Sequence, residues 1–259
     1  MKPRYWIGIA IAGWAAAAAG QPADMPIPPV TTMAFPAGIS VAKLSDGQVF
    51  VDVKGRTLYG LDMRTVLRWT ADPVQFCQAS CTQEWEPLRA PADAGPPANL
   101  KPSRREEGSA PVPDWSVANG PAGPQWVYKR WHLVFTRKGE APGSAAFDGA
   151  DELSWNSLKF VPPVPQLSAP PGIKPVFVRG AYVLADDQGR LLFTGKCEAS
   201  CSGWTELAAG LADGGLGDWS VSRAGDRAQY LYRGAPVFVS PTGAPDDLPA
   251  GSTMLRPDR

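Results

Sequence analysis

Short runs of alternating apolar and polar residues, rich in β-branched and aromatic side chains, predict strands along most of the chain. Early in the chain these runs cover 48–53, 57–61, 125–129 and 133–136. Later they cover 176–178, 181–185, 191–194, 229–233 and 236–240. Segments with a 3.6-residue period are scarce, so helix is expected only as short turns near 77–85 and 197–207. The pattern predicts a mostly β fold.

The residues between these runs are typical of hairpin turns. Lys54-Gly55 and Asp187-Gln188-Gly189 each separate two predicted strands, and we expect those strands to pair. Lys138-Gly139 and Thr242-Gly243 come at the end of a second hairpin. With 28 Pro and 27 Gly, the whole composition favours short strands and many turns.

One stretch of the chain occurs twice. Asp114-Trp115-Ser116-Val117 recurs 104 residues later as Asp218-Trp219-Ser220-Val221. The offset is 134 where Pro28-Pro29-Val30 matches Pro162-Pro163-Val164, and 120 at two C-x-x-x-C pairs. The sequence therefore predicts two tandem homologous, β-hairpin-rich units with little helix. They span 28–161, which we call the first half, and 162–259, the second half.

The changing offset places extra residues in the first half. The decreases from 134 to 120 and from 120 to 104 correspond to additional segments of 14 and 16 residues, which lie within 60–76 and 89–113. The second segment contains Pro96-Pro97 and the charged run Arg104-Arg105-Glu106-Glu107, a composition typical of solvated loops.

The N-terminus has the features of an export signal. Lys2 and Arg4 precede an apolar run over 6–19 that ends in small residues, which predicts a signal peptide over 1–20 and cleavage near Ala19 or Gly20. Residues 21–27 would form a short lead. No Cys follows the run to carry a lipid, and no other apolar stretch is long enough to cross a bilayer. We expect a periplasmic or secreted protein.

The cysteines fit that location. There are four, arranged as the pairs Cys77/Cys81 and Cys197/Cys201, and an even count in an exported chain predicts disulfides. Three connectivities are possible, of which pairing within each C-x-x-x-C is the simplest. Each half would then be pinned by one disulfide.

The order of these motifs resembles a known family. Gly-x-x-Leu-Tyr/Phe, C-x-x-x-C with a downstream Trp, Trp-Ser, and Gln-aromatic-x-Tyr-Lys/Arg follow one another in both halves. This resembles the bacterial secreted-repeat family of predicted lipoproteins with a Y-x-[FWY]-x-x-D motif. The motif is degenerate here, as 59–62 reads Tyr-Gly-Leu-Asp and 193–196 reads Phe-Thr-Gly-Lys. The resemblance implies envelope location and repeat architecture rather than an activity.

Large rings and cations stand at repeated positions and are candidates for ligand binding. They are Tyr59, Trp126, Tyr128, Phe193, Tyr230, Tyr232, Lys129 and Arg233. Alternation sends residues 126 and 128, and likewise 230 and 232, to one face of a strand, where they could stack on a sugar, a porphyrin or another flat ligand. The alternative is that they fill the core of each half, and their repetition favours that role. The cations could instead pair with Asp114 and Asp218.

A metal, haem or redox role is a second possibility. Cys77 and Cys81 together with His132, the only histidine, could bind copper, or the thiols could act in redox chemistry. Covalent haem attachment is disfavoured because no His directly follows either Cys pair.

Composition and motifs limit the remaining function classes. Basic and acidic residues balance at 25 each, which argues against nucleic acid as the main partner. No Ser-centred elbow, phosphate-binding loop or dinucleotide fingerprint is present, so no catalytic residue is assigned. The sequence predicts a non-enzymatic, cofactor-free binding role toward an unknown envelope protein or small ligand. Specificity would lie in the extra segments of the first half.

Overall fold

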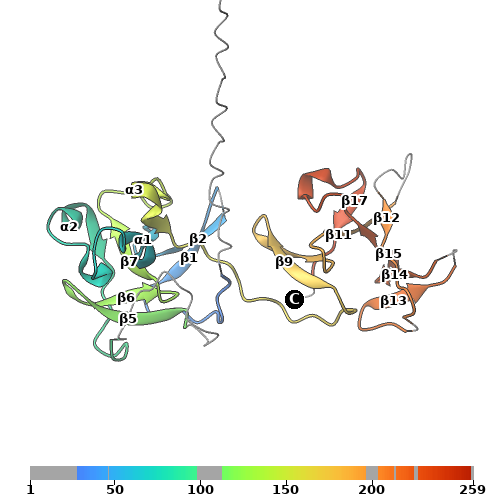
Figure 1. Cartoon of the computed structure of the whole chain (residues 1–259), viewed down its shortest axis with the longest axis horizontal. Coiled ribbons are helices and arrows are strands. Elements are labelled where there is room, and N and C mark those ends of the chain that lie inside the picture. The colour runs from blue at the N-terminus through green and yellow to red at the C-terminus, as the bar shows by residue number, and fades with distance from the viewer. Residues whose placement is uncertain are drawn as a thin grey trace, which may run out of the picture.

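The computed structural model consists mainly of antiparallel strands, as predicted (Figure 1). It describes residues 28–45, 47–97, 113–196, 204–212, 214–224 and 227–257. No helix among them has the length and apolar character needed to span a membrane. Every strand pair lies within one half, and an extended stretch from Val161 leads from the first half to the second (Figure 1).

The first half contains a hairpin and a six-stranded sheet. Its strands are β1 (Ser40–Leu44), β2 (Gly47–Val51), β3 (Leu58–Asp62), β4 (Trp85–Pro87), β5 (Trp115–Gly120), β6 (Gly123–Tyr128), β7 (His132–Arg137) and β8 (Trp155–Ser157). The hairpin is β1-β2. The sheet has the order β5-β6-β7-β3-β8, and β4 also pairs with β7.

The second half uses shorter strands. They are β9 (Lys174–Val178), β10 (Ala181–Ala185), β11 (Leu192–Gly195), β12 (Thr205–Glu206), β13 (Trp219–Ser222), β14 (Gln229–Tyr232), β15 (Ala235–Pro236), β16 (Phe238–Val239) and β17 (Ser252–Met254). They form the hairpin β10-β9 and sheets of order β12-β16-β11-β17 and β13-β14-β15.

Helical segments are short. They are α1 (Met63–Val66), η1 (Pro73–Gln75), α2 (Ser80–Glu84), α3 (Ala150–Leu153) and η2 (Pro245–Asp247). The α3 segment is unusual because Asp151, Glu152 and Leu153 have positive φ angles of 51°, 55° and 66°. Three consecutive residues other than glycine in this region carry a steric cost of about 1–2 kcal/mol each.

The same contacts recur in both halves at the sequence offsets. The β1-β2 hairpin pairs Ser40 with Val51, and β9-β10 pairs Lys174 with Ala185, both 134 residues later. The next turns are also alike. The Asp52 carboxylate accepts hydrogen bonds from the backbone of Lys54 and Arg56, and Asp186 accepts them from Gln188 and Arg190.

The agreement extends into the second hairpin. Trp115 pairs with Tyr128 and Trp219 with Tyr232, 104 residues apart. The Gln125 side-chain amide donates to the carbonyl of Val134, and that of Gln229 donates to the carbonyl of Val237. The offset for this acceptor is 103, because the β6–β7 turn is one residue longer than the β14–β15 turn and contains Trp131 as its extra residue.

A third offset appears at the last strand of each half. Trp155 of β8 corresponds to Ser252 of β17, an offset of 97, so the first half carries seven more residues between β6 and β8. One lies in the β6–β7 turn and the others in the loop between β7 and β8. The two earlier extra segments are evident in the sequence, whereas this one was not predicted from it.

Several predicted elements differ in detail. The run over 48–53 pairs mainly with β1, which was not predicted, and meets 57–61 only through a bridge between Val51 and Thr57. The run over 236–240 is split into β15 and β16, since Pro236 has no N–H to donate to a continuous ladder. In the predicted helical turns, α2 lies within 77–85, whereas 204–207 contains β12 and 197–203 lie outside the described residues.

A buried ion pair ties the start of the first half to its sheet. The Lys129 ammonium contacts the Asp114 carboxylate at 2.5 Å, with side chains only 11% and 4% exposed. The same carboxylate accepts from the backbone N–H and hydroxyl of Thr31, and Lys129 also donates to the carbonyl of Pro29. Burial acts to raise the pKa of Asp114, but the hydrogen bonds from Lys129 and Thr31 outweigh it and lower that pKa.

The second half provides a matched control for the stability of this pair. Asp114→Ala leaves a buried ammonium without its carboxylate, and we expect the free energy of unfolding to fall by about 3–5 kcal/mol. Asp218 and Arg233 form the equivalent pair, but their side chains are 42% and 58% exposed. Asp218→Ala should therefore cost less than about 1 kcal/mol. Urea denaturation of both variants tests this, and equal losses would contradict it.

Candidate functional site

The repeated aromatic residues pack in the interior of their own halves. Tyr59 and Phe193 are completely buried, and Tyr128 and Tyr232 are nearly so. Trp126 and Tyr230 are partly exposed but lie edge-on to Trp115 and Trp219, with interplanar angles of 83° and 85°. The two sets have the same geometry and lie in separate cores, so they do not form one ligand site.

The two candidate cations are engaged by carboxylates. Lys129 pairs with Asp114, and Arg233 pairs with Asp218 at 2.8 Å. Each also lies over the ring that precedes it, Tyr128 or Tyr232. These positions join the ends of a hairpin in both halves, which is a structural role.

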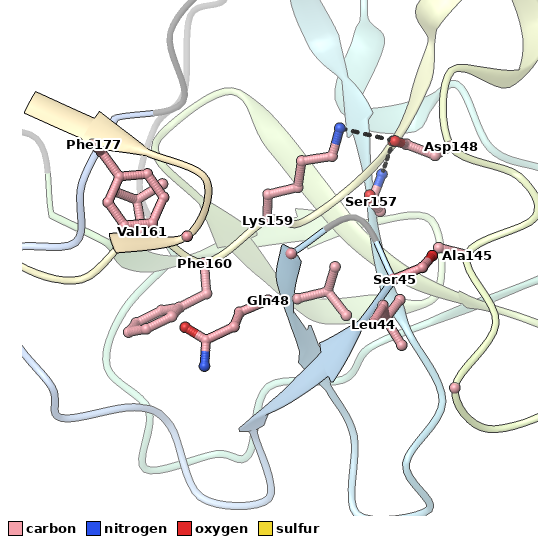
Figure 2. A pocket seen from close by; sticks show the side chains of 14 residues that line it. Leu44, Ser45, Gln48, Ala145, Asp148, Ser157, Lys159, Phe160, Val161 and Phe177 are labelled. Atoms are coloured by element: carbon pink, nitrogen blue, oxygen red, sulfur yellow. Dashed lines mark hydrogen bonds and ion pairs between the residues drawn. The ribbon is translucent and has the colours of Figure 1, made fainter. Parts of the chain in front are cut away.

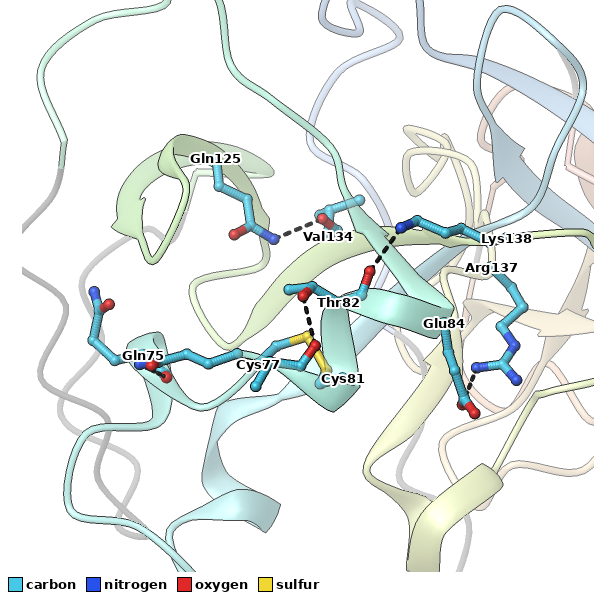
Figure 3. The surroundings of a disulfide bond; sticks show 11 residues. Gln75, Cys77, Cys81, Thr82, Glu84, Gln125, Val134, Arg137 and Lys138 are labelled. Carbon is cyan, nitrogen blue, oxygen red and sulfur yellow. Dashed lines mark hydrogen bonds and ion pairs between the residues drawn. A yellow bond between two sulfur atoms is a disulfide. The ribbon is translucent and has the colours of Figure 1, made fainter.

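The first Cys pair forms the predicted disulfide. Cys77 and Cys81 are bonded, with 5.2 Å between their Cα atoms, at the start of α2 (Figure 3). Around them, Lys138 donates to the carbonyl of Thr82 and Arg137 pairs with Glu84, so the disulfide segment is attached to the end of β7 (Figure 3). Cys197 and Cys201 lie outside the described residues, and their pairing stays a prediction.

His132 does not join the disulfide to make a metal site. It begins β7 opposite Asp62, and the described residues contain no group of three or more potential His, Cys, Asp and Glu ligands. In the bonded state Cys77 and Cys81 offer no thiolate. The copper alternative would require this disulfide to be reduced and the three side chains to gather.

A pocket of about 300 Å³ opens beside the last strand of the first half (Figure 2). Its walls come from the β1–β2 turn, the loop between β7 and β8, and residues 157–161. Phe177 and Gly180 of the β9-β10 hairpin complete it from the second half. Its volume is at the lower end of the range for sites that bind small molecules.

Three polar residues are linked along one side of the pocket. The Lys159 ammonium lies 2.9 Å from Asp148 Oδ2, and Asp148 Oδ1 accepts from the backbone N–H of Ser157 at 2.8 Å (Figure 2). The side chains of Lys159 and Asp148 are 43% and 33% exposed. Ser157 is 6% exposed, and its hydroxyl has no hydrogen-bond partner among the described residues.

Two backbone hydrogen bonds direct these side chains. Leu158 N–H donates to the carbonyl of Leu58, and the Leu158 carbonyl accepts from Phe50 N–H. The Leu158 side chain is buried in the core. Because successive side chains of an extended segment point to opposite faces, Ser157 and Lys159 are directed away from that core, toward the pocket.

The second half repeats this backbone arrangement without these side chains. Leu255 makes the corresponding hydrogen bonds with Leu192 and Leu184. The positions equivalent to Ser157 and Lys159 are Met254 and Arg256. Asp148 lies in the loop that the first half lengthens, close to the strained α3 turn, and strain of this kind is concentrated at functional sites.

Asp148, Ser157 and Lys159 were not predicted as site residues from the sequence. None of them belongs to a known motif. The offset of 97, which aligns the last strand of the first half with that of the second, is also not evident in the sequence. Aligning Leu158 with Leu255 would have shown that their neighbours differ.

His132 makes stability depend on pH in a predictable direction. Its Nδ1 atom is buried without a hydrogen-bond partner among the described residues. Burial, helped by the positive charge of Arg64, lowers the pKa of His132, although Asp62 acts to raise it.

We expect stability to fall as the pH decreases from about 7 to 5, because the unfolded chain takes up a proton near the ordinary histidine pKa before the folded chain does. The slope should reach at most about 1.4 kcal/mol per pH unit. Denaturation at several pH values tests this, with His132→Gln as the variant that should flatten the profile. An unchanged profile in that variant would contradict the assignment.

None of the protein-family models, curated proteins or solved structures compared with the chain matches it. The functional conclusion must therefore come from the contacts of the described residues. Among these, the residues that line the pocket of the first half are the ones to explain.

Proposed function

We propose that this chain is an exported cell-envelope protein that arose from two homologous units and binds a small ligand in the pocket of its first half, without catalysing a reaction. The membership of the secreted-repeat family suggested by the sequence is part of this proposal. One observation carries the binding role: Asp148 and Lys159 pair beside a pocket of the first half, where Ser157 and Lys159 stand at positions that are Met254 and Arg256 in the second half.

The repeated fold makes that observation informative. Residues required for folding must be present in each half, as Asp52/Asp186 and Gln125/Gln229 are. Residues required for binding need to be present only once.

The export component has its own test. Residues 1–27 fused to a phosphatase that is active only outside the cytoplasm should give activity, because their positive start and apolar run have the pattern of a signal peptide. The double variant Ile9→Arg/Ile11→Arg interrupts the apolar run and should abolish the activity. An inactive fusion, or an active double variant, would contradict export through this segment.

The binding component can be tested by filling the pocket. Ala145 lines it, and we expect Ala145→Trp to fold while occupying the ligand's space. A collection of small polar metabolites is screened for compounds that raise the unfolding temperature. A ligand at 100 times its Kd adds about 2.7 kcal/mol, a shift of several degrees for a chain of this size.

The expected result is that stabilising compounds act on the wild type and on Ala250→Trp, a control in the corresponding loop of the second half. They should not act on Ala145→Trp. The pocket is not the binding site if stabilisation persists in Ala145→Trp, or if no compound stabilises the wild type.

A further inference from the structure

We propose that the pocket takes a neutral polyhydroxylated ring, that is, a saccharide unit. This inference deepens the proposed function and rests on it. Three observations lead to it: the cancelled charge of Asp148 and Lys159, the mixture of hydrogen-bond donors and acceptors around them, and the apolar wall that faces them (Figure 2).

The charge of the pocket disfavours ionic ligands. Asp148 and Lys159 are the only charged residues among the described lining residues, and they are 2.9 Å apart. An anionic ligand would have to compete with Asp148 for the ammonium, and a cationic ligand would compete with Lys159 for the carboxylate. A neutral ligand can bind to both without separating them.

The hydrogen-bonding capacity favours hydroxyl groups. An ammonium has three donors, and among the described residues only the Asp148 carboxylate is seen to accept from Lys159. Each Asp148 oxygen accepts one hydrogen bond and has a further lone pair. Ser45 and Gln48, which also line the pocket, can both donate and accept. A hydroxyl also does both, so neighbouring hydroxyls on one ring can satisfy the carboxylate and the ammonium together.

The rest of the lining favours a ring with an apolar face. Val49 and Val161 line it from the first half, and Phe177 contributes its ring from β9 of the second (Figure 2). Phe160 also borders the pocket, but its ring packs in the core against Phe50. The C–H face of a sugar ring can pack on such surfaces while its hydroxyls point to the ion pair. A wholly apolar ligand would instead cover Asp148 and Lys159 without replacing their water.

Ligand-observed NMR with the full exported chain tests the class of ligand. The probes are neutral mono- and disaccharides of glucose and of N-acetylglucosamine, together with glucuronate and glucosamine as charged analogues of the same ring. Cyclohexanol is the apolar comparison. We expect at least one neutral saccharide to bind, with an affinity at least about tenfold greater than that of either charged analogue.

Variants then place the binding. Asp148→Asn and Lys159→Met should each weaken it by about tenfold or more, since each removes a charged hydrogen-bonding partner. Arg256→Met, at the equivalent position of the second half, should have no effect. Unfolding midpoints confirm that each variant folds.

The outcomes separate this inference from the proposed function. Preferential binding of glucuronate or glucosamine, lost in Ala145→Trp, would overturn the neutral class and leave the pocket as a binding site. Saccharide binding that none of the pocket variants affects would overturn the site. The absence of binding by every neutral saccharide would also overturn the inference, while the metabolite screen decides independently whether the pocket binds a small ligand.

Discussion

The position of Leu158 between two strands constrains the rest of the first half. Its N–H reaches β3 and its carbonyl reaches β2, so one residue links the hairpin to the six-stranded sheet, and its side chain fills the core beneath. Because both hydrogen bonds hold the Leu158 backbone in place, the side chains of the two neighbouring residues point to the face opposite the core. Ser157 and Lys159 therefore face the pocket as a consequence of how Leu158 holds the fold together.

The two halves separate the requirements of folding from those of function. Carboxylate-capped turns, a glutamine bound to a strand carbonyl and an aromatic trio occur in both halves with nearly the same geometry. The pocket positions differ, because Ser157 and Lys159 are replaced by Met254 and Arg256. Comparing the two halves of this chain therefore serves the purpose that an alignment of related proteins serves elsewhere, because the side chains of both halves must fit nearly the same backbone arrangement.

The sequence predicted the fold class and one disulfide, but only part of the topology. Alternation located β2, β3, β6, β7, β9, β10, β11 and β14, because each has buried apolar positions or carries large rings. It missed β4, β8, β12 and β17, which are two or three residues long and too short to show a period. The repeated Trp-Ser motifs were noted in the sequence, but not as the starts of strands β5 and β13. Alternation also missed β1, whose apolar residues are only partly buried and whose pairing with β2 depends on a neighbouring turn.

The candidate site was harder to predict for a physical reason. Asp148 meets Lys159 only because a long loop turns back on the strand that follows it, and no local pattern encodes that return. The candidate rings, by contrast, were easy to find because they repeat, and they repeat because they are core. In this chain the strongest sequence signals identify what holds the fold together, and the pocket is found only in three dimensions.

Phe177 ties the pocket of the first half to the second half. Its ring belongs to β9, which pairs with β10 in the second half, yet it lines the pocket beside Val161. Removing the second half would therefore open the pocket on that side, even where the sheet of the first half kept its fold.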